Sequence, residues 1–98
     1  MEKVYIVHWG SAFSDDDGNA KAYSGVHGIY KTLAEAQKGL VECKDVTYDE
    51  VVQNEEPETL EYAEQNTHVY GSVNEGYFEI DYDFGAGPCE IYITITEH

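Results

Sequence analysis

Two alternating stretches near the end of the chain limit what this sequence can fold into. Apolar and aromatic residues alternate with acidic ones over Tyr77–Phe84, and isoleucines alternate with polar residues over Cys89–Thr96. A period of two residues is typical of a strand with one buried face. The intervening Gly85–Pro88 has the composition of a turn. These residues therefore predict a β-hairpin with an apolar inner face and an acidic, aromatic outer face.

The clearest helix signal begins at Thr32. Glu35 follows three residues later, and this spacing is that of a capping box, in which each side chain satisfies a free backbone amide. The residues expected to face a sheet then recur at intervals of three or four: Leu33, Ala36, Leu40 and Cys43. The pattern predicts a helix over about residues 33–44.

A second, shorter helix is expected over about residues 57–65. Pro57 suits a first helical position, and Glu58 suits the positive end of the helix dipole. Leu60 and Ala63 would form its inward face. The stretch between the two helices, residues 45–53, fits either a short strand or a helical turn.

Three further strands are expected. Lys3–Trp9 is β-branched and aromatic and suits a central strand that ends at His8 and Trp9. Gly10–Lys21 reads as a loop, and Ala22–Tyr30 as a second strand in which two glycines mark a bulge. Thr67–Ser72 reads as a third. Together these elements predict one α+β domain over residues 1–98. It would have a mainly antiparallel sheet of four to five strands, the main helix on one face and the short acidic helix beside it.

Charge is distributed very unevenly along the chain. The chain has 5 lysines, no arginine and 20 carboxylates, for a formal charge of −15, and no lysine follows Lys44. Such a surface repels nucleic acid and anionic membranes and attracts basic proteins. The N-terminus does not resemble a signal peptide and no apolar stretch approaches a membrane span, so a cytoplasmic protein is expected.

The outer face of the predicted hairpin is the strongest candidate for a binding site. Glu79, Asp81 and Asp83 are two residues apart, which places neighbours about 6.8 Å apart on one side of a strand. DNA carries its own regular row of charges, one per roughly 3.4 Å of axis on each strand. A carboxylate row with interleaved tyrosines could therefore occupy a basic channel built for DNA. The residues expected to bind a partner are Asp49, Glu50, Glu55, Glu56, Glu58, Glu61, Glu64, Glu75, Tyr77, Glu79, Asp81, Asp83, Glu90 and Tyr92. The alternative is an acidic face that is only solvated.

Other kinds of site have weaker signals. Asp15–Asn19 resembles the start of a calcium loop, but Ala20 and Val26 stand where the EF-hand requires glycine and glutamate. The four histidines are scattered, and no nucleophile, phosphate-loop or metal motif is present. Cys43 and Cys89 are far apart and are expected to be reduced thiols, with one disulfide as the alternative. We expect no enzymatic activity, no metal and no cofactor.

The first 44 residues resemble a group of small phage and prophage proteins. Two segments show this resemblance. Lys3–Val7 is similar to a KVYVV strand, and Gly28–Ala36 is similar to a G-V-Y-x-S-L-E-E-A strand-to-helix junction. The resemblance implies a phage origin and an α+β fold, and it brings no active site. In composition, the acidic second half is similar to phage anti-CRISPR and anti-restriction proteins that mimic DNA.

The sequence therefore favours a non-enzymatic inhibitor that occupies the nucleic-acid-binding site of a host defence nuclease. A CRISPR effector of the Cas9 type is the first candidate partner, and no direct contact with nucleic acid or membrane is expected. The alternatives are an immunity protein for a basic nuclease toxin, a phage accessory or structural protein whose acidity serves solubility, and a cation-binding module. A homodimer through the edge of the last hairpin is also considered.

Overall fold

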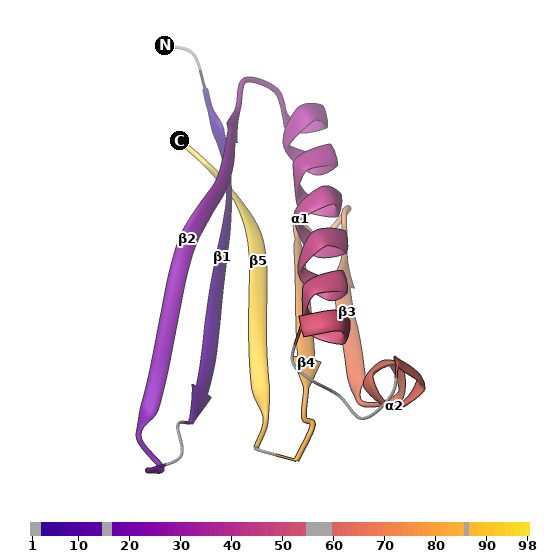
Figure 1. Ribbon diagram of the computed structural model, residues 1–98. Coiled ribbons are helices and arrows are strands. Elements are labelled where there is room, and N and C mark those ends of the chain that lie inside the picture. Colours follow the sequence, from indigo (N-terminus) through magenta and orange to yellow (C-terminus); the bar gives the residue numbers. More distant parts are fainter. Residues whose placement is uncertain (1–2, 15–16, 55–59, 86) are drawn as a thin grey trace.

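A five-stranded antiparallel sheet with one long helix on one face forms this protein (Figure 1). The computed structural model describes residues 3–14, 17–54, 60–85 and 87–98. In chain order the elements are β1 (Tyr5–Ser14), β2 (Ala20–Tyr30), α1 (Leu33–Asn54), α2 (Leu60–Gln65), β3 (Thr67–Ser72), β4 (Tyr77–Tyr82) and β5 (Cys89–Glu97). The strands lie in the order β2-β1-β5-β4-β3. The predicted α+β class is confirmed.

The fold has two layers, so one face of the sheet lies open. The shortest dimension of the molecule is 19 Å, enough for a sheet and one layer of helix. In the part of the chain that the structure describes, α1 packs on one face and no element covers the other (Figure 1). We call the uncovered side the open face.

The first hairpin is longer than the sequence predicted. The expected loop over residues 10–21 is wrong at both ends, because Gly10–Ser14 continues β1 and β2 begins at Ala20. Apart from Phe13, these residues are small and have weak strand preference, but every residue from Gly10 to Phe13 pairs with both β2 and β5. Pairing on both sides outweighs local preference here. His8 and Trp9 therefore lie in the middle of a strand, not at its end.

The glycines of β2 accommodate a bulge and two aromatic rings. Pairing of β1 with β2 shifts register between Val7 and His8, as the sequence suggested. A Cβ atom on Gly25 would lie 2.8 Å from the ring of Trp9, and one on Gly28 would lie 2.6 Å from the hydroxyl of Tyr30. Both positions lack room for a side chain.

The main helix begins as predicted and extends about ten residues further. The amide of Glu35 donates to Oγ1 of Thr32 at 3.1 Å, which caps the first turn. The expected end near residue 44 is wrong, because α1 continues to Asn54. The helical spacing of Leu40 and Cys43 persists into the buried pair Val51 and Val52, which anchors the additional turns.

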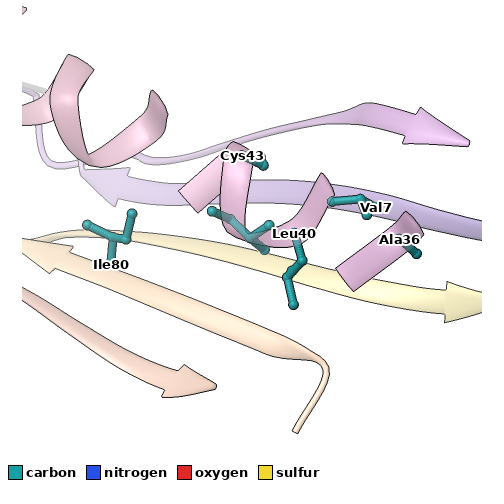
Figure 2. Close-up of a cluster of buried hydrophobic side chains, with 6 residues drawn as sticks. Val7, Ala36, Leu40, Cys43 and Ile80 are labelled. Atoms are coloured by element: carbon teal, nitrogen blue, oxygen red, sulfur yellow. The ribbon is translucent and has the colours of Figure 1, made fainter. Parts of the chain in front are cut away.

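The core lies between α1 and the middle of the sheet. Val7, Ile80 and Ile93 from three adjacent strands pack against Ala36, Leu40 and Cys43 of the helix, as Figure 2 shows for most of them. The predicted inner faces of the helix and the last hairpin are thus confirmed, except for Leu33, which is 47% exposed.

The short helix and the sheet edges differ in part from expectation. The predicted helix over 57–65 is present as α2 from Leu60, and its first three positions lie outside the described residues. Ala63 is buried, but Leu60 is 57% exposed and does not face inward. Hydrogen-bonded neighbours flank β4 and β5 on both sides. The last hairpin therefore has no free edge of the kind considered for a homodimer, and the free edges belong to β2 and β3.

Candidate functional site

The open face carries three carboxylates on adjacent strands. Ile80 is buried beneath α1, so its neighbours Glu79 and Asp81 point to the opposite, open side of β4. Glu90 lies on the same side of β5, where it alternates with the inward-facing Ile91. We call Glu79, Asp81 and Glu90 the acidic cluster.

The strand register brings these carboxylates into direct contact range. Asp81 lies opposite Glu90 across the β4–β5 pair, and Glu79 lies opposite Tyr92. Directly opposite Cβ atoms in an antiparallel pair are about 4.5–5.5 Å apart. Like charges in that position oppose sheet formation, so the acidic cluster costs folding stability.

The protonation of the cluster reflects this crowding. The pKa of Glu79 is raised, first by partial burial, then because its protonated form can donate to Asp81, and then by the negative charges of Asp81 and Glu90. Oδ1 of Asp81 is shielded from solvent and has no hydrogen-bond partner among the described residues. The site thus holds more negative charge than its local hydrogen bonds satisfy.

Tyrosines border the acidic cluster. The hydroxyl of Tyr92 donates to Oε2 of Glu90 at 2.6 Å, and this bond is the main reason that the pKa of Tyr92 is raised to about 12. Tyr70 lies opposite Glu79 on the edge strand β3, and Tyr77 precedes Glu79 on the same face of β4. Their rings add flat, partly apolar contact area beside the charges.

The lysines are far from the acidic cluster in the sequence, and Lys3 and Lys44 lie in ion pairs with carboxylates outside it. Of the two ion pairs in the described regions, one joins Lys3 to Glu97 at 2.8 Å and the other joins the neighbours Lys44 and Asp45 at 2.5 Å. Nζ of Lys44 lies 5.3 Å from the ring centre of Phe78, on the helix side of the sheet. Within the described residues, the acidic cluster forms no ion pair.

The remaining predicted binding residues do not join the acidic cluster. Oδ1 of Asp83 accepts the amide of Gly85 at 2.9 Å, so Asp83 holds a turn after β4 ends. Asp49 and Glu50 lie on α1, across the sheet from the open face. Glu61 and Glu64 lie on α2, and Glu75 lies in the β3–β4 turn. Glu55, Glu56 and Glu58 lie outside the described residues. The structure therefore gathers Glu79, Asp81, Glu90, Tyr77 and Tyr92 and distributes the others over further surfaces.

The open face also carries a pair of histidines that the sequence did not predict. Nε2 of His8 lies 2.7 Å from Oγ1 of Thr96, which lies 3.0 Å from Nε2 of His98. The ring centres of the two histidines are 6.4 Å apart. Nothing local in the sequence links residues at opposite ends of the chain, and only the pairing of β1 with β5 brings them together.

A groove of about 440 Å³ opens beside α1, on the helix side of the sheet. Trp9, Phe13 and Ile91 line it together with Cys43 and Cys89, which are free thiols. Burial raises the pKa of the Cys43 thiol, so it is protonated at neutral pH and a poor nucleophile. Among residues 3–14, 17–54, 60–85 and 87–98, no group of three or more His, Cys, Asp or Glu side chains is arranged so that it could hold a metal ion.

Comparisons with known protein families, curated proteins and solved structures find no match to this chain. Neither helix within the described ranges is both long and apolar enough to cross a membrane. The geometry of the open face therefore carries the functional argument.

Proposed function

We propose that this protein is a DNA-mimicking inhibitor whose open face occupies the nucleic-acid-binding site of a basic protein. The observation that carries the proposal is the acidic cluster. Three carboxylates lie on adjacent positions of two strands, and within the described residues no lysine pairs with them. Folding alone gives no reason for this arrangement, because it opposes pairing of β4 with β5.

The mechanism is competitive binding. A protein channel that binds DNA presents lysine and arginine side chains to phosphates. The carboxylates of Glu79, Asp81 and Glu90 would take the place of phosphates against those cations. Their position on a sheet fixes them before binding, so little conformational entropy is lost on association. Tyr70, Tyr77 and Tyr92 would add the aromatic contacts that are enriched at protein interfaces.

The first candidate target is a CRISPR effector nuclease of the Cas9 type. Such an effector holds its heteroduplex in a positively charged channel and recognises it by shape and backbone. A rigid acidic face can compete for that kind of channel without reading any sequence. No cofactor or catalytic step is required.

The test compares two triple variants that have the same net charge. Glu79→Gln, Asp81→Asn and Glu90→Gln together neutralise the acidic cluster. Glu61→Gln, Glu64→Gln and Glu75→Gln together neutralise three carboxylates outside it. Each variant is added to candidate nucleases in a DNA-cleavage assay across a salt series.

We expect the cluster variant to lose inhibition and the control variant to keep it. Each lost ion pair at an interface that remains partly hydrated is worth about 0.5–1 kcal/mol. Three such pairs amount to a roughly 10- to 150-fold rise in the half-inhibitory concentration. Rising salt should weaken inhibition by the unmodified protein, because salt screens charge pairs.

Three results would contradict the proposal. They are inhibition that is unaffected by salt, equal losses in the two triple variants, and no inhibition of any nuclease despite tight binding to another class of protein. If the protein binds a basic nuclease toxin and no CRISPR effector, DNA mimicry still holds but the target changes. The protein would then be an immunity protein.

A further inference from the structure

The outer edge of β2 lacks a partner over most of its length. The strand order places β2 at one end of the sheet, and every residue from Ala20 to Ser24 is exposed. An exposed edge offers a row of unpaired backbone donors and acceptors to another strand. Proteins usually protect such edges by short strands, prolines, charges or bulges. β2 is eleven residues long and has no proline; its one lysine, Lys21, lies near its start, and its bulge lies near its far end, at residues 26–28.

The two free edges differ in character. β3 has six residues, contacts α2 and lies next to the acidic cluster on β4. Neither edge strand contains a carboxylate, and β2 also carries Lys21. Since the chain has a net charge of −15, two copies repel each other over most of their surfaces. Pairing through β3 would place the two β4 strands, with Glu79 and Asp81, only three strand spacings apart, whereas pairing through β2 places them seven spacings apart. Of the two edges, β2 is therefore the one at which two copies can approach with less repulsion between their acidic clusters.

We infer that β2 pairs with β2 of a second copy, which joins two sheets into one. The regular ladder can run over Ala20–Val26, before the bulge, and the midpoint of that segment is Tyr23. Antiparallel pairing about a two-fold axis at Tyr23 places the two Tyr23 residues opposite each other. The Tyr23 ring is 59% exposed and stacks on Phe13 with ring centres 5.7 Å apart, so it is already oriented to pack across the axis.

Charge at the two ends of the pairing is complementary. With Tyr23 on the axis, Asp17 in the hairpin turn of one copy lies near the Ile29–Lys31 end of β2 in the other copy. Lys31 is exposed there. An exposed pair of this kind adds specificity of register and little affinity. The backbone ladder and the burial of Tyr23 and Val26 supply the attraction.

This dimer leaves both acidic clusters accessible to a partner, and the importance of that accessibility rests on the proposed function. Counting outward, β4 of one copy is seven strand spacings from β4 of the other. At about 4.8 Å per spacing the two clusters are roughly 34 Å apart. A twist of about 20–25° per strand turns the two open faces away from each other by roughly 140–175°. One dimer would therefore engage two target molecules.

The test is the mass of the protein in solution by light scattering over a concentration series. We expect a species of twice the 11.0 kDa chain mass, and its fraction should rise with salt, because salt screens the repulsion between the two acidic chains. That dependence is opposite to the one expected for inhibition, so the two proposals can fail separately. A monomer at every concentration and salt level would overturn the dimer and leave the cleavage assay unaffected.

Two matched variants locate the interface. Tyr23→Glu places two carboxylates at the two-fold axis and should abolish the dimer. Tyr70→Glu, at the similarly exposed tyrosine of the other edge strand, should leave the dimer intact. Circular dichroism confirms that each variant is folded, and exchange of β2 amide hydrogens provides a second measurement, which should slow as concentration rises. A dimer that survives Tyr23→Glu, or one that Tyr70→Glu disrupts, would refute pairing through β2.

Discussion

Replacing Asp81 by asparagine should make this protein more stable at neutral pH. Asp81 lies opposite Glu90 and two residues from Glu79 on the same face of β4, and its Oδ1 has no hydrogen-bond partner among the described residues. Asparagine removes the negative charge and supplies an amide that can donate to either neighbouring carboxylate. The substitution therefore converts a repulsive contact into a hydrogen bond.

The size of the gain follows from two contributions. Relief of a directly opposed like-charge pair is worth about 0.2–1 kcal/mol, and a new hydrogen bond to a partly exposed group about 0.5 kcal/mol. Together they predict a gain of about 0.7–1.5 kcal/mol in the free energy of unfolding. For a domain of this size that corresponds to a rise of about 3–12 °C in Tm.

The gain should disappear on acidification. Because the pKa of Glu79 is raised in the folded state, folding takes up a proton between its ordinary value of 4.5 and the raised value. The stability of the unmodified protein therefore falls as pH rises through that interval. When the carboxyls are protonated the repulsion is absent, and Asp81→Asn has nothing left to relieve.

Urea denaturation at neutral and acidic pH measures both effects. Asp83→Asn is the matched control, because Asp83 follows on the same segment but accepts the Gly85 amide. We expect Asp83→Asn to be neutral or slightly destabilising. The reasoning fails if Asp81→Asn is no more stable than the unmodified protein, or if its gain is equally large in acid. An equal gain from Asp83→Asn would show that only net charge matters.

Three further predictions concern the core, β2 and the tyrosine beside the cluster. Leu40→Ala should lower the free energy of unfolding by about 2–5 kcal/mol, measured by urea denaturation, because Leu40 is fully buried under the helix. Gly25→Ala should displace the ring of Trp9, the single tryptophan, and shift its fluorescence toward that of an exposed indole; an unchanged spectrum would contradict the close packing. Tyr92 should titrate near pH 12, and Glu90→Gln should lower its pKa, as seen in absorbance differences against Tyr92→Phe; an unchanged titration would exclude the Tyr92–Glu90 hydrogen bond as the cause.

Local patterns predicted most of the elements. The Thr32–Glu35 spacing located the start of α1, and alternation located β4, β5 and the side on which Glu79, Asp81 and Glu90 lie. The errors occurred where the pattern was weak. Gly10–Ser14 joined β1 only because two neighbouring strands pair with it, and α1 continued beyond residue 44 because Val51 and Val52 are buried.

The sequence by itself determined which residues are apolar, how they alternate and that no lysine follows Lys44. Those are properties of neighbouring residues, and periodicity expresses them directly. The tertiary structure alone decided that β5 lies between β1 and β4, that α1 leaves one face open, and that β2 is a free edge. Strand order depends on contacts between distant residues, such as His8 with Thr96, and no local spacing encodes those. The charge could thus be read from the chain, but only the assembled sheet shows that part of it is concentrated on a single uncovered face.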